Sequence, residues 1–285
     1  MELFLDCMPC MNRQVLEAAR TATPDEESQA GSMDRAALTL ARRAEFSCAP
    51  AMAQAMHEIV RSVSGVADPY QAIKRRDLDA ALGVEPLLWR FAASADDPLR
   101  AALKVAATGN VMDSAVFADL DITACVAAEL ERAFARCDLP ELAADLVAAR
   151  HVLVIGDNSG ETVFDKVLLA ALAAEGREVV YAVRGRPIIN DATLAEARYA
   201  GVNAYATLMS SGTGAPGAIL EDCTPEFVRE FRDADLVISK GQGNYEALAG
   251  ARRPVYFLLK AKCALIARRL DAAIGDYLLV RRDGS

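Results

Sequence analysis

The chain has 285 residues, and its 31 Lys and Arg against 40 Asp and Glu give a net charge of −9 and an isoelectric point near 4.9. A hydrophobic content of 53% and a mean hydropathy of +0.15 allow a substantial buried core. The acidic balance argues against non-specific binding to nucleic acid or to an anionic membrane. We find no apolar run of the roughly 18 to 20 residues that a transmembrane helix needs and no signal-like start, so we expect a cytoplasmic protein.

Seven cysteines are spread along the chain, and two of them, Cys7 and Cys10, are separated by only two residues. A structural zinc site would need a second close pair of ligands, but the two histidines are His57 and His151, far apart in the sequence. A redox CxxC normally accompanies a thioredoxin-like βαβ pattern, and none follows here. We therefore interpret this pair as buried or helix-capping thiols.

Residues 1–94 are predicted to form an all-helical N-terminal domain. Capping and proline residues mark helix starts at Thr23-Pro24 and at Cys48-Ala49-Pro50, and Gly65 marks a helix end. Pro86 and the single tryptophan, Trp89, are expected to lie in a further short segment. The expected helices cover residues 11–20, 48–64 and 70–82, with a further one starting near residue 24.

Residues 95–285 are predicted to form an α/β domain with a helical lead-in. A helix over residues 99–108 is expected to end at a Gly109-Asn110 cap, and residues 121–150 are expected to be helical. From His151 onward apolar runs alternate with helical patterns, which predicts a doubly wound, mostly parallel α/β/α sheet. The expected strands are residues 152–155, 178–183, 206–209, 236–239, 255–259 and 277–280. The expected helices between them are residues 161–174, 192–200, 225–232, 245–248 and 263–272.

Polar and flexible residues follow nearly every predicted strand. Parallel strands bring their carboxyl ends to one edge of a sheet, where α/β proteins bind ligands. We therefore expect these residues to share one site. They are Asp157, Asn158, Arg184, Asn190, Asp191, Lys240, Gly241 and Asn244, with a Ser210–Gly214 turn and Lys260 and Lys262 after other strands.

Asp157, Asn158 and Asp191 offer only oxygen ligands, a set that suits a hard divalent ion such as Mg²⁺ or Mn²⁺. Backbone N–H groups of glycine-rich turns can close on phosphate oxygens, and Lys240 would add positive charge there. The combination favours metal-assisted phosphoryl chemistry. Two interpretations stay open: Asp157 or Asn158 could merely cap the next helix, and Arg184 could either clamp a phosphate or be solvated.

Several other enzyme classes are disfavoured by their motifs. The sequence has no GxxxxGK[ST], so a P-loop kinase or NTPase is not expected. The turn at residues 156–160 lacks the GxGxxG spacing of a dinucleotide site. Ser159 does not lie in a GxSxG elbow, and no histidine follows it, which argues against a serine hydrolase.

Six motifs occur in one order along nearly the whole chain. They are Cys7-Met8-Pro9-Cys10; Asp68-Pro69-Tyr70 with Lys74; Gly109-Asn110 with Asp113; Asp157-Asn158-Ser159-Gly160-Glu161; Asn190-Asp191; and Lys240-Gly241-Gln242-Gly243-Asn244-Tyr245-Glu246. Through these motifs the sequence resembles the damage-control phosphatases, a metal-dependent family formerly called domain of unknown function 89, and in particular its short microbial members with an early CxxC. One departure is Cys48-Ala49-Pro50, where a fuller proline pair would be expected.

The resemblance implies a helical domain joined to an α/β domain, with Mn²⁺, Co²⁺, Ni²⁺ or Mg²⁺ held by Asp157, Asn158 and Asp191. It also implies hydrolysis of phosphate monoesters, with sugar phosphates, nucleotides and damaged phosphometabolites as substrates. We expect Lys240 to neutralise the negative charge that develops on the phosphoryl group while a water molecule attacks the phosphorus. The competing hypothesis is that the Asp157 carboxylate is itself the nucleophile. Substrate-binding or supporting roles are expected for Asn110, Asp113, Arg184, Asn190, Gly241 and Asn244.

Two further function classes stay open. A methyltransferase that uses S-adenosylmethionine could share this architecture, although its cofactor turn is usually rich in glycine where this chain has Asp157-Asn158. A non-catalytic sensor would bind a phosphorylated metabolite without turnover. In both the phosphatase and the sensor interpretation, the expected partner is a small phosphorylated metabolite. The sequence does not indicate whether the protein is a monomer or an oligomer.

Overall fold

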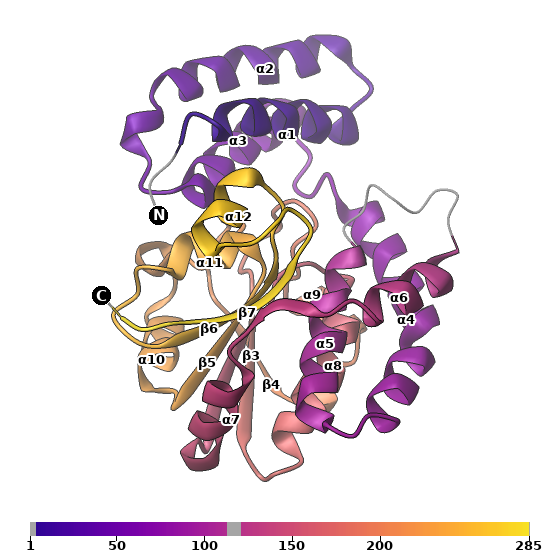
Figure 1. Cartoon of the computed structure of the whole chain (residues 1–285). Coiled ribbons are helices and arrows are strands. Elements are labelled where there is room, and N and C mark those ends of the chain that lie inside the picture. Colours follow the sequence, from indigo (N-terminus) through magenta and orange to yellow (C-terminus); the bar gives the residue numbers. More distant parts are fainter. Residues whose placement is uncertain (1–3, 113–120, 285) are drawn as a thin grey trace.

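The computed structural model describes residues 4–112 and 121–284 and shows three N-terminal helices set on an α/β domain (Figure 1). The predicted fold class, a helical N-terminal region followed by a mostly parallel sheet domain, is confirmed. None of the helices in the described part of the chain has the length and apolarity of a membrane span.

We call the three N-terminal helices, α1 (Cys7–Ala22), α2 (Glu26–Ala41) and α3 (Ala49–Ser64), the cap. Asp25 starts α2 by accepting a hydrogen bond from the Ser28 backbone N–H at 3.0 Å. Gly65 ends α3 with a φ of 73°, a left-handed conformation that glycine adopts without steric cost. The apolar faces of these helices meet in a core of their own, built from Met11, Val15, Ala18, Ala19, Ala36, Met52, Ala53, Met56 and Val60.

The helix α4 (Gln71–Ala93) runs without interruption through Pro86, so the predicted helix end at Leu82 is wrong. Leu78, Val84 and Leu88 of α4 are buried in the same core as strand residues of the sheet. This burial outweighs the one backbone hydrogen bond that proline removes. The apolar cores thus place α4 with the α/β domain, whereas the predicted division at residue 94 groups it with the cap helices.

Two more helices complete this lead-in. They are α5 (Pro98–Thr108), started by the Asp97 side chain, and α6 (Ile122–Leu130), started by Asp121. The helix α5 ends at Thr108 with Gly109 as its C-cap, as predicted, and because Gly109 has a φ of −50° the chain continues into a 3₁₀ turn, Gly109–Met112. A Cβ at residue 109 would lie 3.0 Å from the Cβ of Phe164, a tight contact, so glycine favours close packing on α8 (Glu161–Ala173).

The sheet has seven strands in the order β1-β7-β6-β5-β2-β3-β4. All neighbouring pairs are parallel except β6 and β7, which are antiparallel. The strands are β1 (Phe134–Cys137), β2 (His151–Ile155), β3 (Glu178–Val183), β4 (Thr207–Ser210), β5 (Leu236–Lys240), β6 (Val255–Lys260) and β7 (Tyr277–Arg282). Six of them match the predicted strands closely. The strand β1 lies in a region predicted to be helical, and that prediction is wrong because pairing with β7 determines its conformation.

Helices cover both faces of the sheet (Figure 1). One face packs against α4, α5, α7 (Leu139–Ala148), α8 and α9 (Leu194–Tyr199). The other packs against α10 (Pro225–Asp233), α11 (Gln242–Leu248) and α12 (Ala264–Leu270). The cap lies beyond the carboxyl ends of β2, β3 and β5, on the side of α11 and α12, and Arg61 of α3 donates to the Pro187 carbonyl at 2.9 Å. The region between cap and sheet is therefore where the predicted site residues converge.

Candidate active site

A cavity of about 710 Å³ lies between the cap and the carboxyl edge of the sheet. The sheet side contributes Asp157, Asn158, Asn190 and Asp191, which follow β2 and β3. The cap contributes Cys7, Cys10, Gln14, Glu17 and Pro50, and the α11 and α12 regions contribute Gln242, Glu246, Lys262 and Cys263. Tyr70, just before α4, and Ile189, in the turn after β3, also line the cavity. Predicted site residues thus form one wall of a concave site, which is the usual location of a ligand in an open α/β sheet.

The turns after β2 and β3 are joined by backbone hydrogen bonds. The Ala192 N–H donates to the Asp157 carbonyl at 2.8 Å, and the Ser159 N–H donates to the Asn190 carbonyl at 2.8 Å. Asn158 and Asp191 form an isolated β-bridge between these bonds. The backbone therefore fixes Asp157, Asn158 and Asp191 side by side, as the predicted ligand set requires.

Arg184 lies behind these residues with only 1% of its surface exposed. Its Nε donates to Asp191 Oδ2 at 2.7 Å, its Nη2 to Asp157 Oδ1 at 3.1 Å and its Nη1 to Asn244 Oδ1 at 2.9 Å. Burial alone lowers the pKa of Arg184, but Asp191 and Asp157 raise it on balance. Arg184 is therefore a buried cation that orients both carboxylates, neither solvated nor on the cavity wall.

Glu161, at the start of α8, organises a second buried network. Its Oε1 accepts from Asn158 Nδ2 at 2.8 Å and from Asn110 Nδ2 at 3.0 Å. Its Oε2 accepts from Lys240 Nζ at 2.9 Å, and the same ammonium donates to Asp165 Oδ1 at 2.7 Å. Since the Asn158 nitrogen is committed to Glu161, its amide oxygen is the atom left to act as a ligand.

These two networks place more negative than positive charge in the protein interior. They contain four carboxylates, Asp157, Glu161, Asp165 and Asp191, and two cations, Arg184 and Lys240. Burial raises the pKa of Asp157 well above its ordinary value, the charges of Asp191 and Glu161 add to this, and Arg184 and Lys262 oppose it. A divalent cation at this point would compensate the excess negative charge.

The donor atoms fit a hard divalent ion. Two carboxylates and an amide oxygen facing one cavity are the ligands that Mg²⁺ and Mn²⁺ accept, with further positions left for water or substrate. Among the described residues no cluster of three His, Cys, Asp or Glu side chains has metal-binding geometry. A three-ligand site therefore depends on the amide of Asn158.

The remaining predicted residues lie behind the cavity wall. Lys240 is 1% exposed, and the Asp165 and Glu161 carboxylates raise its pKa although burial alone would lower it. Asn244 is fully buried and holds the turns together by donating to the Gly156 and Lys240 carbonyls and accepting from the Ala218 N–H. Gly241 has a φ of 79°, and a Cβ there would lie 1.9 Å from Asp157 Oδ2. Asp113 lies outside the described residues.

The sequence reasoning missed several residues that the fold brings to the site. Asp165 is fully buried at α8, where it accepts from Lys240 and from the Tyr181 hydroxyl at 2.7 Å. The spacing of Glu161 and Asp165, four residues apart on one helix, is the signal that was available. Gln14 and Glu17 of the cap had no such signal, because only tertiary packing brings α1 over the sheet.

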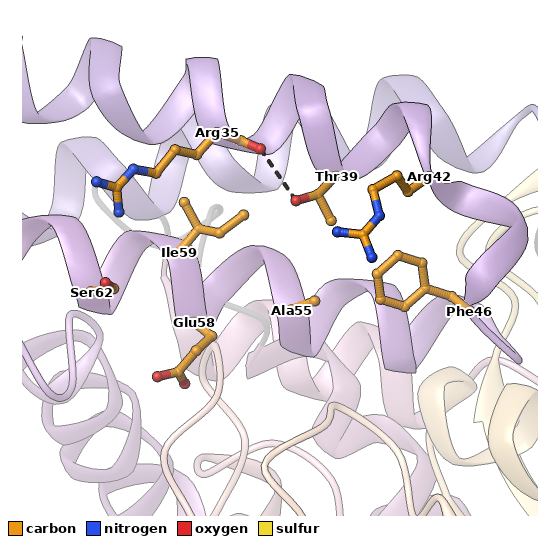
Figure 2. Close-up of a pocket in the computed structure, with 8 residues that line it drawn as sticks. All are labelled: Arg35, Thr39, Arg42, Phe46, Ala55, Glu58, Ile59 and Ser62. Carbon is orange, nitrogen blue, oxygen red and sulfur yellow. Dashed lines mark hydrogen bonds between the residues drawn. The ribbon is translucent and has the colours of Figure 1, made fainter.

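A second cavity, of about 400 Å³, lies between α2 and α3 within the cap (Figure 2). Its lining includes Arg35, Thr39, Arg42, Phe46, Glu58 and Ile59, and shares no residue with the Asp157 cavity. Arg42 is paired with Glu45, and Glu58 with Arg61. The exposed pairs around this groove contain none of the buried, convergent polar groups that mark the Asp157 cavity.

The chain is similar to known proteins over nearly its whole length. The profile of the damage-control phosphatase ARMT1-like domain matches residues 3–278. A damage-control phosphatase of Archaeoglobus fulgidus is 32% identical, covering 95% of this chain and 96% of that protein. An uncharacterised protein of Methanocaldococcus jannaschii is 33% identical, covering 97% and 94% respectively. The crystal structure of a DUF89 family protein from Pyrococcus horikoshii superposes with a TM-score of 0.92 at 31% identity, covering 99% of this chain and all of that one.

Proposed function

The chain belongs to the ARMT1-like damage-control phosphatase family, and from this premise we propose that it is a divalent-metal-dependent phosphatase of small phosphate monoesters. The proposed substrates are sugar phosphates, nucleotides or damaged phosphometabolites. The observation that carries the metal dependence is the excess of buried carboxylates behind an all-oxygen ligand set on the cavity wall. Two relatives named as damage-control phosphatases, each 32% identical over at least 95% of both chains, support the hydrolytic activity.

Asp157, Asn158 and Asp191 would hold the ion, and Mn²⁺, Co²⁺, Ni²⁺ and Mg²⁺ are the candidates. Such an ion supplies charge neutralisation of the phosphoryl group and activation of water at neutral pH. Arg184 keeps the two carboxylates in place, because it bonds one oxygen of each. Glu161 accepts a hydrogen bond from the amide nitrogen of Asn158, which leaves the amide oxygen of Asn158 to act as a ligand of the ion.

The chain also offers a cation on the cavity wall. Lys262 lines the cavity, and its charge lowers the pKa of Asp157, which places it near the ligand set. We assign to Lys262 the neutralisation of phosphate charge that the sequence had suggested for Lys240. Lys240 instead holds Glu161 and Asp165 from inside the protein, and its raised pKa keeps it charged.

The experiment is an assay of phosphate release by chelator-stripped protein given Mg²⁺, Mn²⁺, Co²⁺ or Ni²⁺, with p-nitrophenyl phosphate and a panel of sugar phosphates and nucleotides. Asp191→Asn should lower metal-dependent turnover by more than about 100-fold, since even residues that only support a ligand commonly cost 10- to 100-fold. Asp233→Asn, an exposed carboxylate paired with Arg232, is the matched control and should retain activity. Metal binding without release of phosphate from any substrate would favour the sensor interpretation instead.

A further inference from the structure

Ile189, on the cavity wall, has a backbone conformation that β-branched residues rarely adopt. Its φ is 44°, and it is the second residue of a turn closed by a 3.0 Å hydrogen bond from the Asp191 N–H to the Ile188 carbonyl. A positive φ at this position of a turn normally calls for glycine or asparagine. The isoleucine backbone is therefore strained, and such strain persists only where the surrounding structure holds it.

The Ile189 side chain is held by the cap. It is partly buried and packs against the apolar core of the cap, the cluster that includes Met11, Ala49 and Tyr70. A second contact fixes the same loop, since Arg61 of α3 donates to the carbonyl of Pro187, two residues earlier. The conformation of this loop thus depends on contacts from the cap.

The other end of the same turn carries the proposed metal ligand. Asn190 accepts the Ser159 N–H at 2.8 Å, and Asp191 forms the bridge with Asn158. Ile189 is therefore separated from Asp191 by one residue and sits between the cap on one side and the ligand set on the other. A relaxation of φ at Ile189 would rotate the following peptide units and shift Asp191 relative to Asp157 and Asn158.

We propose that Ile189 is a positioning residue that couples docking of the cap to the placement of Asp191. The inference rests on the proposed function, because it assumes that Asp191 binds the ion. When the cap is docked, packing of the Ile189 side chain holds the strained turn and the ligands are aligned. By linkage, an ion bound at Asp191 stabilises the docked cap to the same extent.

Three substitutions separate strain from packing. Ile189→Ala keeps a Cβ that disfavours a positive φ but loses the contact with the cap, so its turn relaxes. Ile189→Gly loses the same contact but adopts the positive φ without cost. Ile189→Val keeps a β-branched side chain against the cap and serves as the conservative control.

The experiment measures the Mn²⁺ affinity of each variant by electron paramagnetic resonance of the free ion, and hydrogen exchange of α1–α3 with and without Mn²⁺. We expect Ile189→Ala to bind Mn²⁺ about tenfold more weakly than the unsubstituted protein, within the roughly 5- to 150-fold range of coupled sites. Ile189→Gly should bind Mn²⁺ within about threefold of the unsubstituted protein, but Mn²⁺ should no longer slow exchange in α1–α3. Ile189→Val should retain both properties.

Two results would overturn the inference while leaving the phosphatase proposal intact. One is an Ile189→Ala variant that binds Mn²⁺ as tightly as the unsubstituted protein. The other is Mn²⁺-dependent protection of α1–α3 that persists in Ile189→Gly. A residue that merely stabilises the fold would give equal losses of stability in the Ala and Gly variants with unchanged Mn²⁺ affinity. If the unsubstituted protein binds no divalent ion, both proposals fail together.

Discussion

Replacement of Arg184 tests whether the buried carboxylates of the site depend on this guanidinium. In Arg184→Met the ion pairs with Asp191 and Asp157, at 2.7 and 3.1 Å, are lost while the side-chain volume is largely kept. At an effective dielectric constant of about 20, each pair represents roughly 5–6 kcal/mol of attraction. Much of this is offset by the cost of burying the charges, and breaking one side of a buried pair commonly costs about 3–5 kcal/mol.

The expected loss is measurable by thermal unfolding of chelator-treated protein. At roughly 2–4 °C per kcal/mol for a chain of this size, Tm should fall by about 6–20 °C. Added Mn²⁺ should restore part of this loss, because a divalent cation compensates the same carboxylates. Arg186→Met, an exposed position in the same turn, is the matched control and should change Tm by only about 1–2 °C. A Tm for Arg184→Met within 2 °C of that control would refute the charge argument.

Three further outcomes follow from the site. Burial and neighbouring carboxylates raise the pKa of Asp157, so the stability that this group contributes to the metal-free protein is present below the ordinary carboxyl pKa and is lost as the pH rises through the raised pKa. The increase in Tm that Mn²⁺ causes should therefore be larger at pH 8 than at pH 5.5. This increase should be absent in Asp157→Asn. Gly241→Ala places a Cβ against the Asp157 carboxylate and should abolish Mn²⁺ binding in a titration, whereas Gly250→Ala, with open space around it, should not. Alkylation of the three cysteines that line the cavity, Cys7, Cys10 and Cys263, should block phosphate release, and a variant with all three replaced by Ala should resist the reagent.

The convergence of Asp157, Asn158 and Asp191 could be predicted from the sequence for a geometric reason. Each follows an apolar run, and parallel strands joined by helices bring their carboxyl ends to one edge whatever the details of packing. The strand β1 could not be predicted in this way. Its two middle residues are exposed and its two end residues partly buried, so it lacks the alternation of a half-buried strand, and the pairing with β7 is a contact between residues more than 130 positions apart.

The position of the Lys240 side chain is predicted better by the strand in which it lies than by the glycine-rich turn that follows it. A lysine before a glycine-rich turn suggested a side chain reaching toward phosphate. Side chains alternate along a strand, however, and Leu236 and Ile238 of β5 face the core that contains α8. Lys240 falls on the same face and meets the Glu161 and Asp165 carboxylates of that helix. The period of two was visible in the sequence and, applied to the last residue of the strand, indicates a buried ion pair.

The residues on the cap side of the cavity are held in place by a different kind of contact from those on the sheet side. The ligand residues that follow the strands are placed mainly by backbone hydrogen bonds between turns, as between Asp157 and Ala192. Gln14 and Glu17 of α1 reach the cavity only because the cap packs on the α/β domain through contacts such as those of Ile189 and Arg61. We therefore expect substitutions in the cap core to alter substrate preference and cap docking first, and metal binding only through the contacts that hold the Ile189 turn.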